Sequence, residues 1–224
     1  MEDSSKIINR EYTFTPTEEE LQLLSEDQLS HSPEVIEEDP DYDIELVAGV
    51  DVSYNCKFAF SCAVVLNEEL ELIESSCAQT FVSFPYVSGY LSYRELKPAM
   101  AAITKLRYFD VLMVNGHGLA HPRGYGLASQ IGVELGRPTI GVARRLMVGH
   151  QQDPEAEETP IIYRGRIIGA KITSPNGAPV YVSIGHKMTL DTCIRLVKDY
   201  TVGGRLPEPL KLAHSLSRTV MSEY

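Results

Sequence analysis

The sequence predicts an α/β fold in which a mixed central sheet is flanked by helices. Two observations carry this prediction. The apolar run Val111 to Val114 has no helical stripe, which is typical of an interior strand. Three strand-like segments precede it, at 46–53, 59–66 and 70–75, and the short turns between them favour antiparallel pairing.

The elements before this central strand can be predicted from local patterns. Thr17-x-x-Glu20 is a capping box that predicts a short helix, whereas residues 1–16 are expected to be weakly ordered. Residues 31–43 hold two prolines and several acids and are interpreted as a linker or surface loop. Residues 78–84 would extend the third strand or form an edge strand. A helix is predicted over 91–108, and its regular part is expected to start just before Pro98, because proline suits a first turn.

After the central strand, the pattern predicts a helix over 125–135 and a buried parallel strand over 138–143. Residues 161–173 and 179–183 are interpreted as a peripheral hairpin around the Asn176-Gly177 turn. Helices over 189–200 and 209–221 follow. This order of elements is that of a ribonuclease H-like fold. In that fold Asp51, in the first strand, would lie beside Asn115, at the end of the fourth, and Glu95 could reach the same cleft.

Composition divides the chain into an acidic N-terminal extension, residues 1–45, and a catalytic domain, residues 46–224. The extension holds 15 of the 31 acidic groups and only two of the 20 basic ones, so the remainder is nearly neutral despite a net charge of −11. No apolar run is long enough for a membrane span. The four cysteines, which form no CxxC pair, are expected to be reduced thiols of a cytoplasmic or nuclear protein.

The turn after the central strand is the strongest candidate for a binding site. Asn115-Gly116-His117-Gly118 places glycines at two alternate positions, where a ligand can approach the backbone without meeting a Cβ atom. Ligands of α/β proteins bind at this end of the strands. A plain strand-to-helix turn is the alternative, but His117, His121 and Arg123 crowd the same few residues.

Several blocks of the sequence resemble the endonuclease V family of inosine-directed nucleases. They are VAGVDVSY at 47–54, FPYVSGYLSYRE at 84–95, NGHGLAHPRGYGLASQIG at 115–132, RPTIGVAR at 137–144, and GHKMTLDTCIRL with GRLPEPLKLAH between 185 and 214. The resemblance implies Mg²⁺-dependent hydrolysis, with Mn²⁺ as a substitute, of the second phosphodiester bond 3′ to a hypoxanthine base. The products would be a 3′-hydroxyl and a 5′-phosphate. The implied partner is inosine-containing DNA or RNA, single-stranded or as a mismatched duplex, bound by a monomer.

The resemblance also implies roles for individual residues. Asp51, Glu95 and Asn115 occupy the positions of the metal ligands, with His214 and Arg144 beside the reacting phosphate. The base pocket is assigned to Gly116, Gly118, Leu119, Leu127 and Met147. The strand wedge is assigned to Pro85, Tyr86, Val87 and Ser88. The contacts to the reacting strand are assigned to His121 and Arg123. Backbone groups of residues 116–119 are expected to read the edge of the base.

Asn115 departs from the family pattern, in which this position is an aspartate. An amide keeps one carbonyl oxygen but removes a negative charge, so metal affinity and hydrolysis should both fall. The residue could be an engineered substitution, a natural change that gives a weakened nuclease or a non-cleaving inosine reader, or a site that regains aspartate by deamidation. The sequence leaves these alternatives open, together with the choice between DNA and RNA. Ser88 replaces a second proline of the wedge, and Arg144 replaces a frequent lysine.

Overall fold

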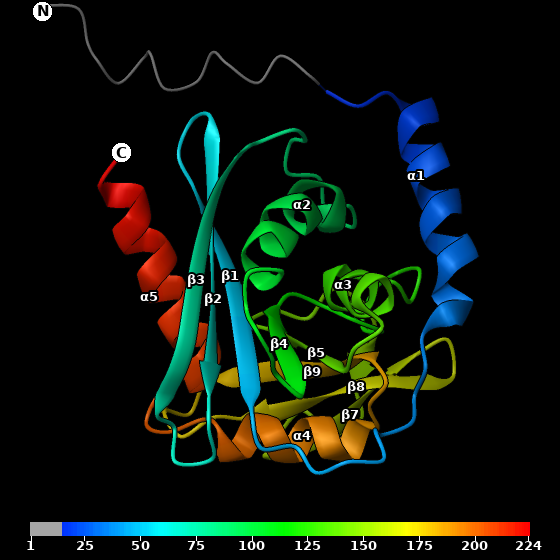
Figure 1. The fold of residues 1–224 in the computed structure, drawn as a ribbon. Coiled ribbons are helices and arrows are strands. Elements are labelled where there is room, and N and C mark those ends of the chain that lie inside the picture. Colours follow the sequence, from blue (N-terminus) through cyan, green and yellow to red (C-terminus); the bar gives the residue numbers. More distant parts are fainter. Residues whose placement is uncertain (1–14) are drawn as a thin grey trace, which may run out of the picture.

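The computed structural model describes residues 15–224, in which one sheet carries helices on both of its faces (Figure 1). Nearly all of the segment expected to be weakly ordered, residues 1–16, lies outside this range. The helical elements are α1 (Glu18–His31), the short 3₁₀ helix η2 (Ser32–Glu34), α2 (Leu91–Ile103), α3 (Leu127–Leu135), α4 (Leu190–Asp199) and α5 (Glu208–Ser222).

The sheet has nine strands in the order β3-β2-β1-β4-β5-β9-β8-β7-β6. β1 pairs antiparallel with β2 and β2 with β3, whereas β1, β4 and β5 are parallel neighbours. The mixed sheet that the sequence predicts is therefore confirmed. The strands are β1 (Val47–Tyr54), β2 (Phe58–Leu66), β3 (Leu72–Phe81), β4 (Val111–Asn115), β5 (Thr139–Ala143), β6 (His150–Gln151), β7 (Glu158–Tyr163), β8 (Arg166–Thr173) and β9 (Pro179–His186).

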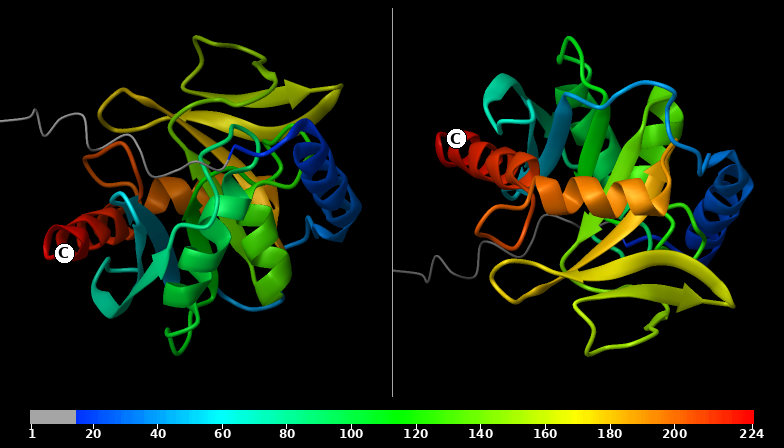
Figure 2. Two further views of the ribbon diagram at one scale, coloured as in Figure 1. Left: turned by 90° about the horizontal axis from the view of Figure 1, so that it is seen from above. Right: turned by 90° about the horizontal axis from the view of Figure 1, so that it is seen from below.

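Two apolar cores lie on opposite faces of the sheet. α2 and α3 cover one face, and α4 and α5 cover the other, as the views from above and below show (Figure 2). Successive side chains of a strand point to opposite faces, so Val50 packs under α2 while Val47 packs under α5. Alternate positions of β1 are thereby directed toward two different sets of helical side chains.

The predicted start of the second helix is wrong. α2 begins at Leu91, so Pro98 lies in its interior and Glu95 lies one turn inside the helix instead of at its entrance. Pro98 is buried together with Ala99 and Ala102 on the face that meets the sheet. Burial of this face offsets the backbone hydrogen bond that a proline removes from a helix.

The predicted peripheral hairpin is also partly wrong. The Asn176-Gly177 turn joins two strands as expected, but β9 lies inside the sheet, between β5 and β8. Residues 161–173 are two strands, because Arg164 and Gly165 both adopt positive φ and turn the chain between β7 and β8. The signal for this turn is weak, since arginine rarely occupies the left-handed region.

The described part of the N-terminal extension, residues 15–45, is held to the rest of the molecule. The capping box at Thr17 and Glu20 forms as predicted. The segment interpreted as a linker contributes Val35 to the α4–α5 core, and the Asp39 carboxylate accepts hydrogen bonds from the backbone N–H and the hydroxyl of Thr189, the N-cap of α4. Within residues 15–224, none of the helices has the length and apolar character needed to cross a bilayer.

The expectation that all four cysteines are reduced is wrong for one pair. Cys62 in β2 and Cys77 in β3 face each other across the strand pair and form a disulfide. The two residues are 15 positions apart in sequence, and only the antiparallel register brings them together. Cys56 and Cys193 are free thiols.

Candidate active site

The candidate site is centred on Asp51 in β1, whose carboxylate is buried. β1 and β4 are parallel neighbours, so the end of β4 brings Asn115 beside it. The Asn115 amide donates a hydrogen bond from Nδ2 to Oδ1 of Asp51 over 2.6 Å. The two residues that the fold prediction places together are thus in direct contact.

α5 supplies the other side of this centre. Gly49 in β1 has no room for a Cβ atom, which would stand 2.5 Å from the Pro209 carbonyl carbon, so α5 can lie directly on the strand. One turn farther along α5, His214 places Nδ1 at 2.8 Å from Oδ2 of Asp51. A carboxylate accepts, so Nδ1 carries a proton and donates it to Asp51. The His214 side chain is 39% exposed, which leaves its outer edge open to solvent.

Glu95 approaches the same region from α2. Its carboxylate accepts a hydrogen bond from the Tyr54 hydroxyl over 3.1 Å. Burial raises the pKa of Glu95 to about 8, and the charge of Asp51 acts in the same direction. The positive charge of Arg94 offsets only part of this effect, so the Glu95 carboxyl group is in an environment that would favour binding of a cation.

The donors around Asp51 fit a hard divalent cation. Asp51 and Glu95 offer carboxylate oxygens, and Asn115 offers an amide oxygen once its side chain is turned from the orientation that donates to Asp51. Across residues 15–224, no three His, Cys, Asp or Glu side chains gather into a metal-binding group. Because an amide has no negative charge, two carboxylates and an amide bind a divalent cation more weakly than three carboxylates would.

A small cavity lies between the turn after β4 and the start of α2. Its volume of about 20 Å³ has room for roughly one water molecule, so a purine can enter only if its walls move. Leu127 and Met147, two of the residues assigned to the base pocket, lie in these walls. The complete lining is Gly89, Leu91, Ser92, His117, His121, Gly126, Leu127 and Met147.

Packing inside the protein, in place of the expected approach of a ligand, explains one of the two glycines of the turn. A Cβ atom at Gly118 would stand 1.9 Å from the carbonyl oxygen of Ile184, so this glycine allows β9 to pack against the turn. At Gly116 a Cβ atom would only make contact with the Leu127 side chain at 3.4 Å. Close packing within the protein, and not the approach of a ligand, accounts for Gly118.

The backbone of residues 116–119 is largely occupied by internal hydrogen bonds. The N–H groups of Gly116, Gly118 and Leu119 donate to the Val142 carbonyl, the Ser183 hydroxyl and the Ile184 carbonyl. The carbonyl groups of residues 117–119 also accept bonds from within the chain. The expectation that these groups read a base therefore does not match the hydrogen bonds of this structure.

One side-chain atom in the cavity wall has no hydrogen-bond partner. His117 places Nε2 at 3.0 Å from the Arg145 carbonyl oxygen, which can only accept, so Nε2 holds the proton. Nδ1 is buried and without a partner in the structure. Burial lowers the His117 pKa to about 4, so the ring is neutral at pH 7 and Nδ1 is a hydrogen-bond acceptor.

The segment assigned to the strand wedge projects from the surface. Tyr86 is 69% exposed, with Pro85 and Val87 half-buried and Ser88 exposed beside it. Arg94 of α2 donates to the Phe84 carbonyl oxygen over 2.7 Å and fixes the base of this loop. An exposed aromatic ring on an anchored loop is available to stack on a base.

His121 and Arg123, assigned to the nucleic-acid strand, point toward the protein. His121 is buried, and its Nε2 lies 3.0 Å from the carbonyl oxygen of Gly89. Burial, with the nearby charge of Arg123, lowers the His121 pKa to about 4. Arg123 donates to the same carbonyl over 2.5 Å. Arg144, at the end of β5, is exposed and the most accessible cation of the predicted set.

Comparison with known proteins identifies the family. The family model for endonuclease V matches residues 28–215. The chain belongs to the endonuclease V family. The resemblance found from the sequence blocks is therefore confirmed, and the protein is a nuclease by family. An endonuclease V of Thermofilum pendens is 42% identical over 193 residues, which cover 84% of this chain and 83% of that protein.

Solved structures of endonuclease V agree with the fold. The Streptomyces avermitilis enzyme is 34% identical and superposes with a TM-score of 0.82, covering 94% of this chain and 96% of that one. The catalytic domain of human endonuclease V gives 0.82 at 28% identity, over 93% and 98% of the two chains. Endonuclease V of Ciona intestinalis, crystallised with a 24mer DNA containing an inosine followed by a ribo-adenosine, gives 0.81 at 29% identity, over 92% and 99%.

Three residues of the endonuclease V site were not predicted from the sequence. Tyr54 holds the Glu95 carboxylate, Ser217 donates to the His214 carbonyl and lies 3.5 Å from Oδ2 of Asp51, and Gln28 bonds to the segments around the cavity. Tyr54 and Ser217 follow Asp51 and His214 by three positions. Neither residue could be assigned from this spacing, because side chains three positions apart in a strand point to opposite faces and a serine in a helix has more common structural explanations.

Proposed function

We propose that this chain is an inosine-directed endonuclease that hydrolyses the second phosphodiester bond 3′ to a hypoxanthine base in DNA or RNA. The products are a 3′-hydroxyl and a 5′-phosphate. The observation that carries the proposal is the Asp51 centre, with His214 and Glu95, close to a cavity lined by Leu127 and Met147. The inosine-containing DNA bound by the Ciona intestinalis relative supports the choice of substrate.

The oxygen donors around Asp51 support a set of metal ligands for this reaction. Mg²⁺, or Mn²⁺ in its place, would be held by the carboxylates of Asp51 and Glu95 and the amide oxygen of Asn115, and it would stabilise the negative charge that develops on the phosphate. His214 would orient Asp51 through Nδ1, and its more exposed edge would help to activate the attacking water. Arg144 is the exposed cation at the same end of the sheet and would contact the phosphate backbone.

Recognition requires the base to leave its stack. Extrusion of a base costs a few kcal/mol, and less for a weak pair such as one with inosine. Tyr86, on its anchored loop, would stack in the space that the base leaves. In the pocket, the N1–H group of hypoxanthine is a donor, whereas N1 of adenine is an acceptor. The unpartnered Nδ1 of His117 is an acceptor of the kind that favours hypoxanthine.

Asn115 would weaken hydrolysis without altering the pocket. Its amide gives the metal no negative charge, and in this structure its NH₂ group faces Asp51. The deciding experiment incubates this chain and its Asn115→Asp form with Mg²⁺ and labelled single strands of DNA and RNA that carry one inosine. We expect cleavage at the second bond by the aspartate form and slower cleavage by the parent. An intact strand with the aspartate form would refute the proposal.

A second candidate function is an inosine reader that does not cleave. The hydrogen bond from Asn115 to Asp51 favours it, because this bond stabilises the donor set without a cation. It predicts tighter binding of an inosine strand than of the matching adenine strand, with no product even at high Mn²⁺. Equal affinity for both strands would exclude the non-cleaving reader. Product formed by the parent chain would show that the chain is a weakened nuclease.

A further inference from the structure

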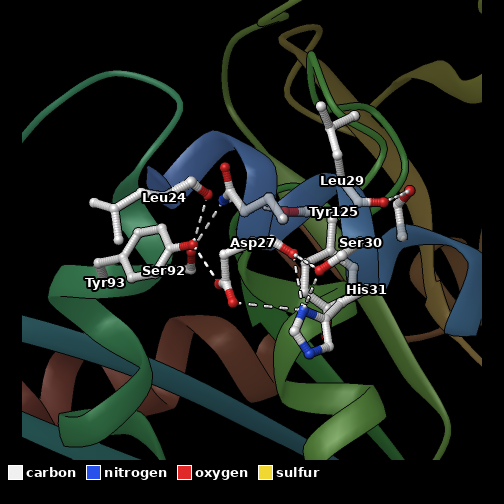
Figure 3. A network of polar contacts seen from close by, with 10 residues as sticks. Leu24, Asp27, Leu29, Ser30, His31, Ser92, Tyr93 and Tyr125 are labelled. Carbon is white, nitrogen blue, oxygen red and sulfur yellow. Dashed lines mark hydrogen bonds and ion pairs between the residues drawn. The ribbon is translucent and has the colours of Figure 1, made fainter. Parts of the chain in front are cut away.

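α1 lies against the segments that form the cavity, although it precedes the catalytic centre in sequence (Figure 3). The Tyr93 hydroxyl, in the first turn of α2, lies 2.8 Å from the Leu24 carbonyl oxygen and 2.7 Å from the Asp27 carboxylate, and it can donate its one proton to either. The His31 ring stacks on Tyr125. The helix therefore touches both the start of α2 and the turn that leads into α3.

Gln28 is the centre of this contact and is only 1% exposed. Its amide Nε2 donates to the Ser92 hydroxyl and to the Tyr125 carbonyl, each over 3.3 Å. Its Oε1 accepts from Nε of Arg123 over 2.6 Å. All three hydrogen bonds are made to residues more than 60 positions away, so this glutamine joins three segments of the chain.

Arg123 connects Gln28 to the cavity wall through hydrogen bonds. Its guanidinium donates to the Gly89 carbonyl over 2.5 Å and lies over the Tyr90 ring at 4.5 Å. Gly89 lines the cavity and adopts φ of +83°, a conformation that only glycine takes readily. Arg123 is thus held on one side by Gln28 and holds Gly89 on the other.

We propose that Gln28 is a positioning residue that fixes the Gly89 wall of the base pocket through Arg123. This inference rests on the proposed function of the cavity. The Gly89 carbonyl accepts hydrogen bonds from both Arg123 and His121, so this wall should stay in place when a base enters. The helix that carries Gln28, in the acidic N-terminal segment, is then part of the recognition site.

The test replaces Gln28 by methionine, which has a similar length and makes none of the three hydrogen bonds. Gln22→Met is the matched control, because Gln22 is an exposed residue of the same helix and bonds only to Glu26 in this structure. Fluorescence anisotropy compares labelled single strands that carry one inosine or one adenine. We expect Gln28→Met to weaken inosine binding about tenfold and to leave adenine binding unchanged, a difference of about 1.4 kcal/mol.

Hydrogen exchange of residues 84–92 gives a second readout that does not depend on the base. Exchange in this segment should become faster in Gln28→Met and stay unchanged in Gln22→Met. Gln28→Glu, which keeps an acceptor for Arg123, should restore slow exchange and most of the preference for inosine. Equal losses for both strands, or unchanged exchange, would overturn the positioning role. If the parent chain binds both strands equally, the proposed function is contradicted. Faster exchange in Gln28→Met would then still support the positioning of the Gly89 segment by Gln28.

Discussion

The Asp51 centre and the proposed base pocket differ in how the sequence encodes them. The centre is built where two parallel strands end, so Asp51 and Asn115 meet as soon as the sheet forms. The proposed pocket is built mainly from loops, and its walls are held by contacts between distant segments, such as Gln28 with Arg123. A strand register places chemical groups reliably, whereas a loop needs separate hydrogen bonds for each wall.

The largest expected effect concerns the centre. Asn115→Asp should raise the rate of inosine-strand cleavage by about 10²–10³-fold in Mg²⁺, the range for one electrostatic group at a reacting oxygen. Binding of the inosine strand should change little, because the pocket is separate. Single-turnover kinetics and anisotropy measure the two quantities. A change in affinity as large as the change in rate would show that the centre and the pocket are not independent.

Gly118→Ala tests the packing role of the glycine turn. The new Cβ atom would overlap the Ile184 carbonyl oxygen, so the free energy of unfolding should fall by about 3 kcal/mol or more. Gly124→Ala is the control, because its Cβ atom would meet nothing and only its φ of +64° opposes the change. It should cost about 1 kcal/mol. Urea unfolding measures both, and equal losses would argue against close packing at Gly118.

The free energy of unfolding should decrease in mild acid, because His121 is kept neutral in the folded chain. The His121 pKa falls to about 4 in the folded chain from an ordinary value of 6.5, so between these limits the unfolded chain binds more protons. The free energy of unfolding should therefore decrease as the pH falls from 6.5 to 4, by up to about 3 kcal/mol from this residue. His121→Asn should reduce that dependence in urea titrations. An unchanged pH profile would contradict a buried, neutral His121.

The smallest expected effect concerns the wedge. Tyr86→Ala should weaken binding to an inosine-containing duplex by about 1–3 kcal/mol, the usual contribution of a base stacked on an aromatic ring. Single strands should be less affected, since no partner base has to be replaced. Anisotropy with matched single-stranded and duplex probes separates these cases. Equal losses on both probes would place Tyr86 in general strand contact instead of in the wedge.

Much of the fold could be predicted from local sequence patterns. Apolar runs marked β1, β2, β4 and β5, and the capping box at Thr17 marked a helix start that the structure confirms. The start of α2 was predicted wrongly from Pro98. The rule that proline suits a first turn does not include the stabilisation that comes from burying Pro98 inside the helix. The Gln28 and Ser217 contacts could not be predicted, since nothing local indicates which residue a buried polar side chain will meet 95 or 166 positions away.

The disulfide between β2 and β3 has a consequence for self-association. β3 forms one edge of the sheet and exposes Leu72, Ile73 and Phe81, and an exposed apolar edge strand can pair with another chain. The opposite edge is safer because β6 has only two residues. The Cys62–Cys77 bond ties the vulnerable strand to its neighbour. A reducing environment would remove that tie and leave the β2–β3 ladder to hold the edge, so we expect reduction to make pairing at this edge easier.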